Sequence, residues 1–231
     1  VGPHVAASAV AMDKTLTKLV ADQAKIPQAA WELVRRSDLD CRLDAVVSQL
    51  ESRFSYPMFV KPAGTGSSVG VSKAADRECL IRGLLGAAVY DDKVLVEEFI
   101  QGKEIEVAVM GNHNPVASVC GEIDSGAEFY DYDAKYVTDT SVAYIPARID
   151  EETAEKVRDM AVRVYQAIGC RGLSRVDFFV TDADNRVVLN EINTIPGFTS
   201  ISMYPKLFAA SGIPYSKLID ELLGLAMEEE E

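Results

Sequence analysis

The spacing of apolar residues along the chain predicts several amphipathic helices. Apolar residues recur every three or four positions over residues 76–89 and 151–168, and Gly169 is a residue type that often follows a helix end. Pro214 opens a further helix with the same spacing. Each of these helices has one apolar face, which we expect to pack against another element.

A helix near the start of the chain carries charges in its first turns. Asp13 can cap this helix, which we expect to run to about Lys25. Its expected apolar face consists of Leu16, Leu19, Val20 and Ala24. Positive charge is unfavourable at a helix N-terminus, so a solvent-facing side chain is the simplest expectation for Lys14 and Lys18.

Short apolar runs predict strands in other parts of the chain. Residues 54–62 and 93–100 each form one. Residues 104–110 alternate between polar and apolar positions and can pair with residues 115–120 across the turn GNHN. The short turn predicts that these last two runs are antiparallel.

A loop rich in glycine and hydroxyl groups follows the strand that contains Lys61. Residues 64–70, GTGSSVG, offer backbone N–H groups and hydroxyls that suit phosphate binding. The loop is not a Walker A loop, since no lysine follows Gly70, and its last glycine is one residue late for the Rossmann fingerprint. A plain surface hairpin explains the loop alone equally well, and Lys61 before it favours phosphate binding.

Residues 172–199 predict a hairpin that carries the most distinctive chemistry of the chain. Two strand-like runs, residues 175–180 and 186–190, flank the turn-forming segment TDADN. Exposure to water explains the acidic residues of the turn. It does not explain the polar residues that interrupt the apolar run at the end of the second strand, because burying an unpaired charge there would cost several kcal/mol.

Two of these polar residues, together with one residue of the first strand, suggest a metal site. Glu191 and Asn193 share a face because side chains alternate along a strand, and antiparallel pairing can bring Asp177 beside them. Oxygen ligands of this kind, with Arg175 on the same side, suit Mg²⁺ that holds an anionic phosphate.

Composition and charge exclude several classes of function. The 231 residues carry a net charge of −13 and an isoelectric point of about 4.7, which argues against nucleic-acid and membrane-surface partners. No apolar run is long enough to span a membrane, and nothing resembles a signal peptide. The four cysteines lack metal-site spacing, and we expect reduced thiols in a cytoplasmic protein.

Two further segments each allow more than one interpretation. Glu97 and Glu98 form either a solvated strand edge or a nucleotide hinge, in which a carboxylate accepts the adenine amino group. Residues 124–142 are polar and contain closely spaced tyrosines. A long segment of this kind is usually functional or disordered, and its aromatic residues favour a functional loop.

Five motifs together resemble D-alanine–D-alanine ligases of the ATP-grasp superfamily. They are FVKPAGTGSSVG, VLVEEFIQGKEIEVAV, YDYDAKY, SRVDFF and NEINTIPGFTSIS, and they span almost the whole chain in family order. The resemblance implies an α+β chain with the ATP-grasp fold, in which two lobes with antiparallel sheets hold ATP between them. The lobes are expected at residues 13–99 and 100–231. Residues 1–12 are expected to connect them to an N-terminal domain that this sequence lacks.

The resemblance also implies which residues bind ATP and metal. Lys14 and Lys61 would hold the phosphates, Glu97 would accept the adenine amino group, and Glu104 would bind the ribose. The expected ATP-binding residues are Lys14, Lys61, Ser68, Glu97, Glu98, Phe99, Ile100, Glu104 and Phe179. The expected ligands of two Mg²⁺ ions, with Mn²⁺ as an alternative, are Asp177, Glu191 and Asn193.

A second group of residues is implied to act on the substrates. Arg175 and the backbone N–H of Gly197 would stabilise an oxyanion, and Ser67 with Tyr136 would order the loops over the first D-alanine. The expected catalytic residues are Arg175, Ser67, Tyr136, Lys135 and Gly197. The expected substrate-binding residues are Ser202, Met203 and Tyr130.

The implied function is the ATP-dependent ligation of two D-alanines through an acyl phosphate, for peptidoglycan precursor synthesis. The full-length protein is expected to be a cytoplasmic homodimer. A competing hypothesis is a fragment that binds ATP without ligase activity of its own, and another is a ligase that uses D-lactate or D-serine as the second substrate. An ATP-grasp carboxylate–amine ligase with different substrates is a further hypothesis, which the tyrosine-rich loop and the region of Ser202 argue against.

Overall fold

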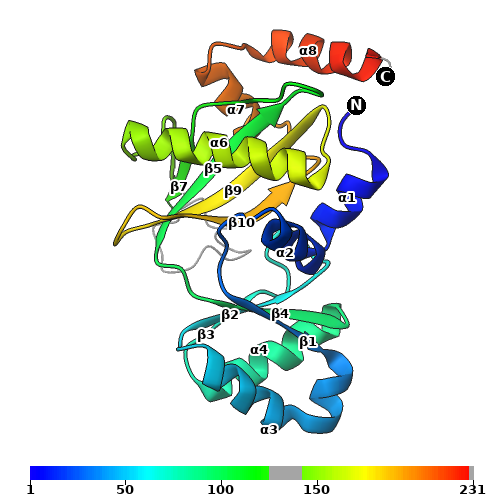
Figure 1. Cartoon of the computed structure of the whole chain (residues 1–231), viewed down its shortest axis with the longest axis vertical. Helices are drawn as coiled ribbons and strands as arrows, with labels where there is room; N and C mark the ends of the chain where they lie inside the picture. Colours follow the sequence, from blue (N-terminus) through cyan, green and yellow to red (C-terminus); the bar gives the residue numbers. More distant parts are fainter. Residues whose placement is uncertain (125–141, 229–231) are drawn as a thin grey trace.

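The computed structural model describes residues 1–124 and 142–228, which form two antiparallel sheets with helices packed on them (Figure 1). The expected α+β class is confirmed. Each sheet has its own buried apolar cluster, so the chain is organised around two cores.

The smaller sheet contains β1 (Trp31–Arg35), β2 (Met58–Pro62), β3 (Ser72–Ala74) and β4 (Lys93–Glu98), in the order β1-β4-β2-β3. One face is covered by α3 (Arg36–Arg53) and α4 (Arg77–Tyr90). Met58 and Val60 are buried under these helices. Because side chains alternate along β2, Phe59 and Lys61 lie on the opposite face.

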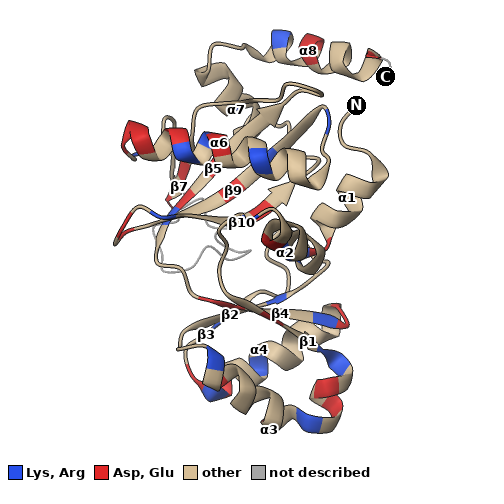
Figure 2. Ribbon diagram, in the orientation of Figure 1, with Lys and Arg blue, Asp and Glu red and all other residues tan. Residues whose placement is uncertain are grey.

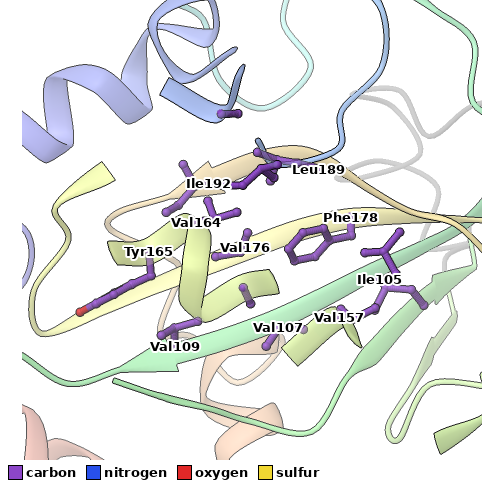
Figure 3. Close-up of a cluster of buried hydrophobic side chains, with 14 of the residues drawn as sticks. Ile105, Val107, Val109, Val157, Val164, Tyr165, Val176, Phe178, Leu189 and Ile192 are labelled. Carbon is purple, nitrogen blue, oxygen red and sulfur yellow. The ribbon is translucent and has the colours of Figure 1, made fainter. Parts of the chain in front are cut away.

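The larger sheet contains β5 (Gly102–Met110), β6 (Val116–Ala117), β7 (Gly121–Asp124), β8 (Val142–Tyr144), β9 (Leu173–Thr181) and β10 (Val187–Asn193). Its order is β10-β9-β5-β7-β8, and β6 pairs with the end of β5. Helix α6 (Glu151–Ile168) packs on one face. Figure 3 shows Ile105, Val107 and Val109 of this face together with Val157 and Val164 of the helix.

The opposite face of the larger sheet changes from apolar to acidic along β5. Two helices, α7 (Met203–Ala210) and α8 (Tyr215–Met227), belong to the cluster that contains Ala108 and Met110 at one end. Glu104 and Glu106 lie on the same face at the other end, because side chains alternate along the strand. This acidic end of the sheet is the one that adjoins the smaller sheet.

Two N-terminal helices pack on the core of the larger sheet. Residues 1–12, expected as a connection, contain α1 (Val5–Met12), and α2 (Lys14–Gln23) follows it. Ala7 and Ala21 belong to the larger core. The expected lobe bounds stay a prediction, and this packing favours a smaller lobe that begins near Trp31.

Asp13 caps α2 as predicted, but only half of the predicted apolar face packs on the larger core, namely Val20 and Ala24. Asp13 accepts hydrogen bonds from the backbone N–H groups of Thr15 and Leu16. Leu16 and Leu19 are 40% and 54% exposed, whereas Lys18 is 3% exposed. The spacing of apolar residues could not reveal this orientation, because it depends on a charged partner of Lys18 in the smaller sheet.

Most of the other predicted elements are present. Helix α6 has the predicted bounds, α4 is shifted by one residue, and the hairpin of β9 and β10 is antiparallel. The elements α1, β1, α3, β3, β7, β8 and α7 were not predicted. All four cysteines are free. Within the described ranges, no helix combines the length and apolar character needed to cross a membrane.

Candidate functional site

A cavity of about 480 Å³ lies between the two sheets. Figure 2 shows acidic and basic positions on the strands on either side of this space. The cavity is lined by every residue that we expected to bind ATP: Lys14, Lys61, Ser68, Glu97, Glu98, Phe99, Ile100, Glu104 and Phe179. Ser67 and Glu191 also line it. The geometry therefore gathers these residues around one space large enough for a small molecule.

Glu97 in β4 is buried between two lysines. One carboxylate oxygen pairs with Lys18, and the other lies 2.5 Å from Lys61 Nζ. Burial by itself raises the pKa of Glu97, but the two lysines outweigh burial and bring the pKa to about 2. Burial likewise lowers the pKa of Lys61, and the carboxylate of Glu97 more than reverses this effect. Glu97 is therefore a buried anion with two positive partners.

Lys14 joins the start of α2 to the glycine-rich loop. Its backbone N–H donates to Ala63 O at 3.0 Å, and its ammonium group donates to Thr65 O. Burial lowers the pKa of Lys14, and the carboxylates of Glu191 and Glu97 oppose this effect. The side chain lies at the mouth of the loop, where a phosphate would meet its charge.

The glycine-rich loop is folded tightly on itself. The Thr65 hydroxyl donates to Val69 O at 2.9 Å. Ser67 and Ser68 have φ values of 52° and 59°, a left-handed conformation that side chains rarely adopt. At Gly70, φ is +74° and a Cβ would come within 2.7 Å of neighbouring side chains. Strained backbone of this kind is concentrated at ligand-binding sites.

The segment between β4 and β5 closes one side of the cavity. Glu98 is tied to β1, because its carboxylate accepts a hydrogen bond from Ala30 N at 2.8 Å. The ring of Phe99 stacks on that of Phe59 with centroids 5.9 Å apart. Phe99 and Ile100 lie outside both strands, so their backbone groups are outside the strand ladders. This arrangement suits a flat apolar ring with polar edges.

A row of acidic residues crosses three strands at the acidic end of the larger sheet. Glu106 in β5 is opposite Asp177 in β9, which is opposite Glu191 in β10. A register shift between Leu189 and Glu191 turns Glu191 and Asn193 to the Asp177 face. The structure brings Asp177, Glu191 and Asn193 together, and β10 extends past its predicted end to include Glu191 and Asn193.

Arg175 lies beside this row and binds two of its members. Its Nε and Nη2 atoms each lie 2.7 Å from one oxygen of Asp177, and Nε lies 3.3 Å from Glu106 Oε2. Burial lowers the pKa of Arg175, but Asp177 and Glu106 more than compensate and raise it. A bidentate pair fixes both position and orientation of the guanidinium group.

The oxygen groups fit a hard divalent cation after one rearrangement. Asp177 and Glu191 offer carboxylates, and Asn193 offers an amide oxygen, which are ligands that Mg²⁺ prefers. Asn193 Nδ2 donates to Asp177 Oδ2 at 3.0 Å and to Glu191 Oε1 at 3.4 Å. A half-turn of the amide would present its oxygen instead. Over residues 1–124 and 142–228, no group of three or more His, Cys, Asp and Glu residues has a metal-binding arrangement. The set of Asp177, Glu191 and Asn193 contains only two carboxylates.

The residues expected to bind the second substrate lie beyond the cavity lining. The Ser202 hydroxyl accepts a hydrogen bond from Thr199 N at 3.0 Å. A Cβ at Gly197 would lie 2.6 Å from Ser202 Oγ, so the glycine allows the two segments to approach closely. Met203 is the first residue of α7 and is buried in the cluster that this helix forms with β5. The substrate-binding roles of Ser202 and Met203 stay predictions, and Tyr130, Lys135 and Tyr136 lie outside the described residues.

Sequence reasoning did not assign two charged residues at the site. Lys18 was expected to face solvent, and Glu106 was treated only as part of an alternating strand. A signal for Lys18 was available, because Lys14 and Lys18 are four residues apart and share a helix face. A signal for Glu106 was weaker, since its position depends on the pairing of β5 with β9.

Comparisons with known proteins agree with this arrangement. A family model described as "D-ala D-ala ligase C-terminus" matches residues 20–224. A D-alanine–D-alanine ligase of Acetivibrio thermocellus is 54% identical over 228 residues, which cover 99% of this chain and 61% of that protein. The chain therefore spans less than two thirds of the length of this relative.

Two solved structures have the same fold over almost the whole chain. The D-alanine–D-alanine ligase of Coxiella burnetii has a TM-score of 0.84 and 37% identity, and the match covers 98% of this chain and 59% of that one. VanG D-Ala:D-Ser ligase from Enterococcus faecalis has a TM-score of 0.88 and 37% identity, with coverage of 97% and 64%. The predicted ATP-grasp fold is thereby confirmed.

Proposed function

Because this chain belongs to the D-alanine–D-alanine ligase family, we propose that the protein of which it forms part ligates two D-alanines with the conversion of ATP to ADP and phosphate. The chain supplies the ATP-binding and catalytic portion. The product would be the dipeptide D-alanyl-D-alanine, which serves peptidoglycan precursor synthesis, cell-wall formation and cell shape.

The observation that carries this proposal is the single cavity that gathers the expected ATP-binding residues from both sheets. Lys14 and Lys61 lie where they can neutralise phosphates. We assign Glu97 and the backbone of Phe99 and Ile100 to the edge of adenine. Glu104 at the start of β5 would accept hydrogen bonds from the ribose hydroxyls. The cavity thus combines basic, apolar and acidic groups of the kinds that a nucleoside triphosphate requires.

The proposed reaction depends on neutralising the phosphate charge and on aligning the reacting groups. In the first step, the carboxylate of one D-alanine attacks the γ-phosphorus of ATP, ADP leaves, and an acyl phosphate forms. In the second step, the amine of the other D-alanine attacks the acyl carbon, phosphate leaves, and the amine loses a proton. Mg²⁺ held by Asp177, Glu191 and Asn193 would supply additional neutralisation of phosphate charge, and Mn²⁺ is an alternative ion.

Arg175 is the residue of this chain best placed to act on both steps. Its guanidinium is held by two buried carboxylates beside the row of oxygen ligands. A fixed positive charge stabilises a developing oxyanion without reorganising during the reaction. We assign the same task to the backbone N–H of Gly197. Lys135 would neutralise the γ-phosphate, and Ser67 with Tyr136 would order the loops over the first D-alanine.

The proposal also covers the parts of the full-length protein that lie outside this chain. We expect an N-terminal domain that completes the site of the first D-alanine, a homodimeric assembly and a cytoplasmic location. The relatives are longer than this chain, which supports the first of these expectations. The chain by itself would bind ATP and would form no dipeptide.

A second candidate is a ligase that takes D-serine as the second substrate. The observation that favours it is the close structural match to VanG D-Ala:D-Ser ligase. The residues that distinguish the second substrate would include Ser202, Met203 and Tyr130. An ATP-binding fragment that never acts as a ligase is a third candidate.

The test is a product assay with the full-length protein, ATP, Mg²⁺ and an equimolar mixture of D-alanine and D-serine, resolved by mass spectrometry. The proposal predicts D-alanyl-D-alanine as the main product. A main product that contains D-serine would support the second candidate. ATP binding without any dipeptide from the full-length protein would support the third and overturn the proposal.

A further inference from the structure

Lys18 is a buried cation behind the cavity. It is 3% exposed, its ammonium group pairs with Glu97 Oε1, and it does not line the cavity. Its helix, α2, packs on the core of the larger sheet, whereas Glu97 belongs to β4 of the smaller sheet. The pair therefore joins the two cores of the chain at the nucleotide site.

The two oxygens of Glu97 are both engaged by lysines. Lys61 lies in the cavity and binds Oε2, while Lys18 lies outside the cavity lining and binds Oε1. Under the proposed function, Lys61 binds phosphate and Glu97 accepts the adenine amino group. The Lys61–Glu97 contact engages one N–H donor of Lys61 and one lone pair of Oε2, so the phosphates and the adenine amino group compete with this contact for the same two groups.

We propose that Lys18 is the permanent counter-ion of Glu97 and thereby sets the preference of this site for adenine. Lys61 is the exchangeable partner. When a nucleoside triphosphate enters, Lys61 turns from Glu97 to the phosphates, and the freed oxygen accepts the adenine amino group. Lys18 stays in place, so that Glu97 remains ionised and oriented. This inference rests on the proposed function, and it adds a positioning residue that does not touch the nucleotide.

The reason is the cost of a buried charge. Without Lys18, the departure of Lys61 would leave a carboxylate that is 4% exposed with no cation in contact among the residues that the structure describes. Such a group takes up a proton rather than remain charged. A protonated carboxyl group can donate from its O–H to the 6-oxo group of hypoxanthine and can accept from the 6-amino group of adenine, so it would bind both bases.

The experiment measures the dissociation constants of ATP and inosine triphosphate for the 231-residue chain by calorimetry in the presence of Mg²⁺. The variants are Lys18→Met and the control Lys156→Met, whose lysine lies in an exposed pair on α6. We expect Lys18→Met to weaken ATP binding about 10- to 100-fold. We expect inosine triphosphate binding to change much less, so that the preference for ATP falls about tenfold or more. Lys156→Met should match the parent for both nucleotides.

Several results would overturn the inference. One is ATP binding by Lys18→Met within about threefold of the parent. Another is an equal loss for both nucleotides with circular dichroism unchanged, which would indicate a general effect on the cavity. A parent chain that binds no ATP would instead contradict the proposed function, so the two failures are distinguishable.

A second variant keeps the test decisive if Lys18→Met does not fold. The double variant Lys18→Met, Glu97→Gln removes both charges of the pair and leaves no unpaired charge at these two positions. It should fold and bind both nucleotides with similar affinity, because a glutamine amide can either accept from an amino group or donate to an oxo group. Full preference for ATP in this variant would show that the Lys18–Glu97 pair does not set the choice of base.

Discussion

Replacing Glu97 by glutamine should destabilise the smaller sheet in a way that depends on pH. The folded chain lowers the pKa of Glu97 from its usual 4.5 to about 2. Because a shift of one unit corresponds to about 1.4 kcal/mol, the ionised carboxylate contributes about 3 kcal/mol to the free energy of unfolding. Glu97→Gln removes this contribution and leaves Lys18 and Lys61 without their shared anion.

The pH dependence follows from the direction of the shift. Since the folded pKa lies below the unfolded pKa, the contribution is fully present above about pH 5 and is lost as the pH falls toward about 2. The difference between the parent and Glu97→Gln should therefore be about 3 kcal/mol at pH 7. It should shrink to roughly 1–2 kcal/mol at pH 3, because protonation of this carboxyl group then stabilises the unfolded chain more than the folded chain.

The assay is urea unfolding followed by tryptophan fluorescence at both pH values. The chain has one tryptophan, and Trp31 pairs directly with Glu97 across β1 and β4, so its signal reports on this sheet. Glu152→Gln is the matched control, because its carboxylate is 79% exposed in a surface pair and should contribute less than about 1 kcal/mol. A difference below about 1 kcal/mol at pH 7, or one that is equal at pH 7 and pH 3, would refute the assignment of Glu97 as a stabilising buried anion.

Three further predictions concern the larger sheet and the loop over the site. Glu191→Gln or Asn193→Ala in the full-length protein should abolish Mg²⁺-dependent ATP turnover with unchanged circular dichroism, and near-normal turnover in either variant would contradict the metal assignment. Gly102→Ala should lower the thermal midpoint strongly, because the new Cβ would lie 2.2 Å from Val180 O; a midpoint equal to that of the parent would refute this. Tyr136→Phe should raise the incorporation of D-lactate relative to D-alanine by roughly one to two decades, if the proposed hydrogen bond to Ser67 exists and its loss costs about 1–3 kcal/mol. An unchanged product ratio would show that the hydroxyl has no such role.

The sequence predicts the helices and strands best where their apolar residues face one core. Helix α6 has an uninterrupted apolar face and lies at its predicted bounds. Helix α2 is different, because its orientation is decided by the charged pair of Lys18 and by small buried residues such as Ala21. Spacing rules weigh apolar residues by position and carry no information about a partner in another sheet.

The candidate site was predictable where it depends on local pairing. Alternation along a strand places Glu191 and Asn193 on one face, and hairpin pairing brings Asp177 to them. The register shift before Glu191 was not predictable, and strict alternation from Val188 would have turned both residues away. The place of Glu106 depends on the pairing of strands distant in sequence, which hydrophobic patterning alone does not reveal.

The most direct test of the central claim, that ATP binds in the cavity between the two sheets, is photolabelling of the 231-residue chain. The chain would be irradiated with 8-azido-ATP and Mg²⁺, digested, and mapped by mass spectrometry, with an excess of ATP as competitor. We predict labelling of peptides that contain Phe99 and Ile100 or Phe179, and its loss in the presence of ATP. Labelling confined to peptides that do not line the cavity, or labelling that ATP does not reduce, would contradict the claim.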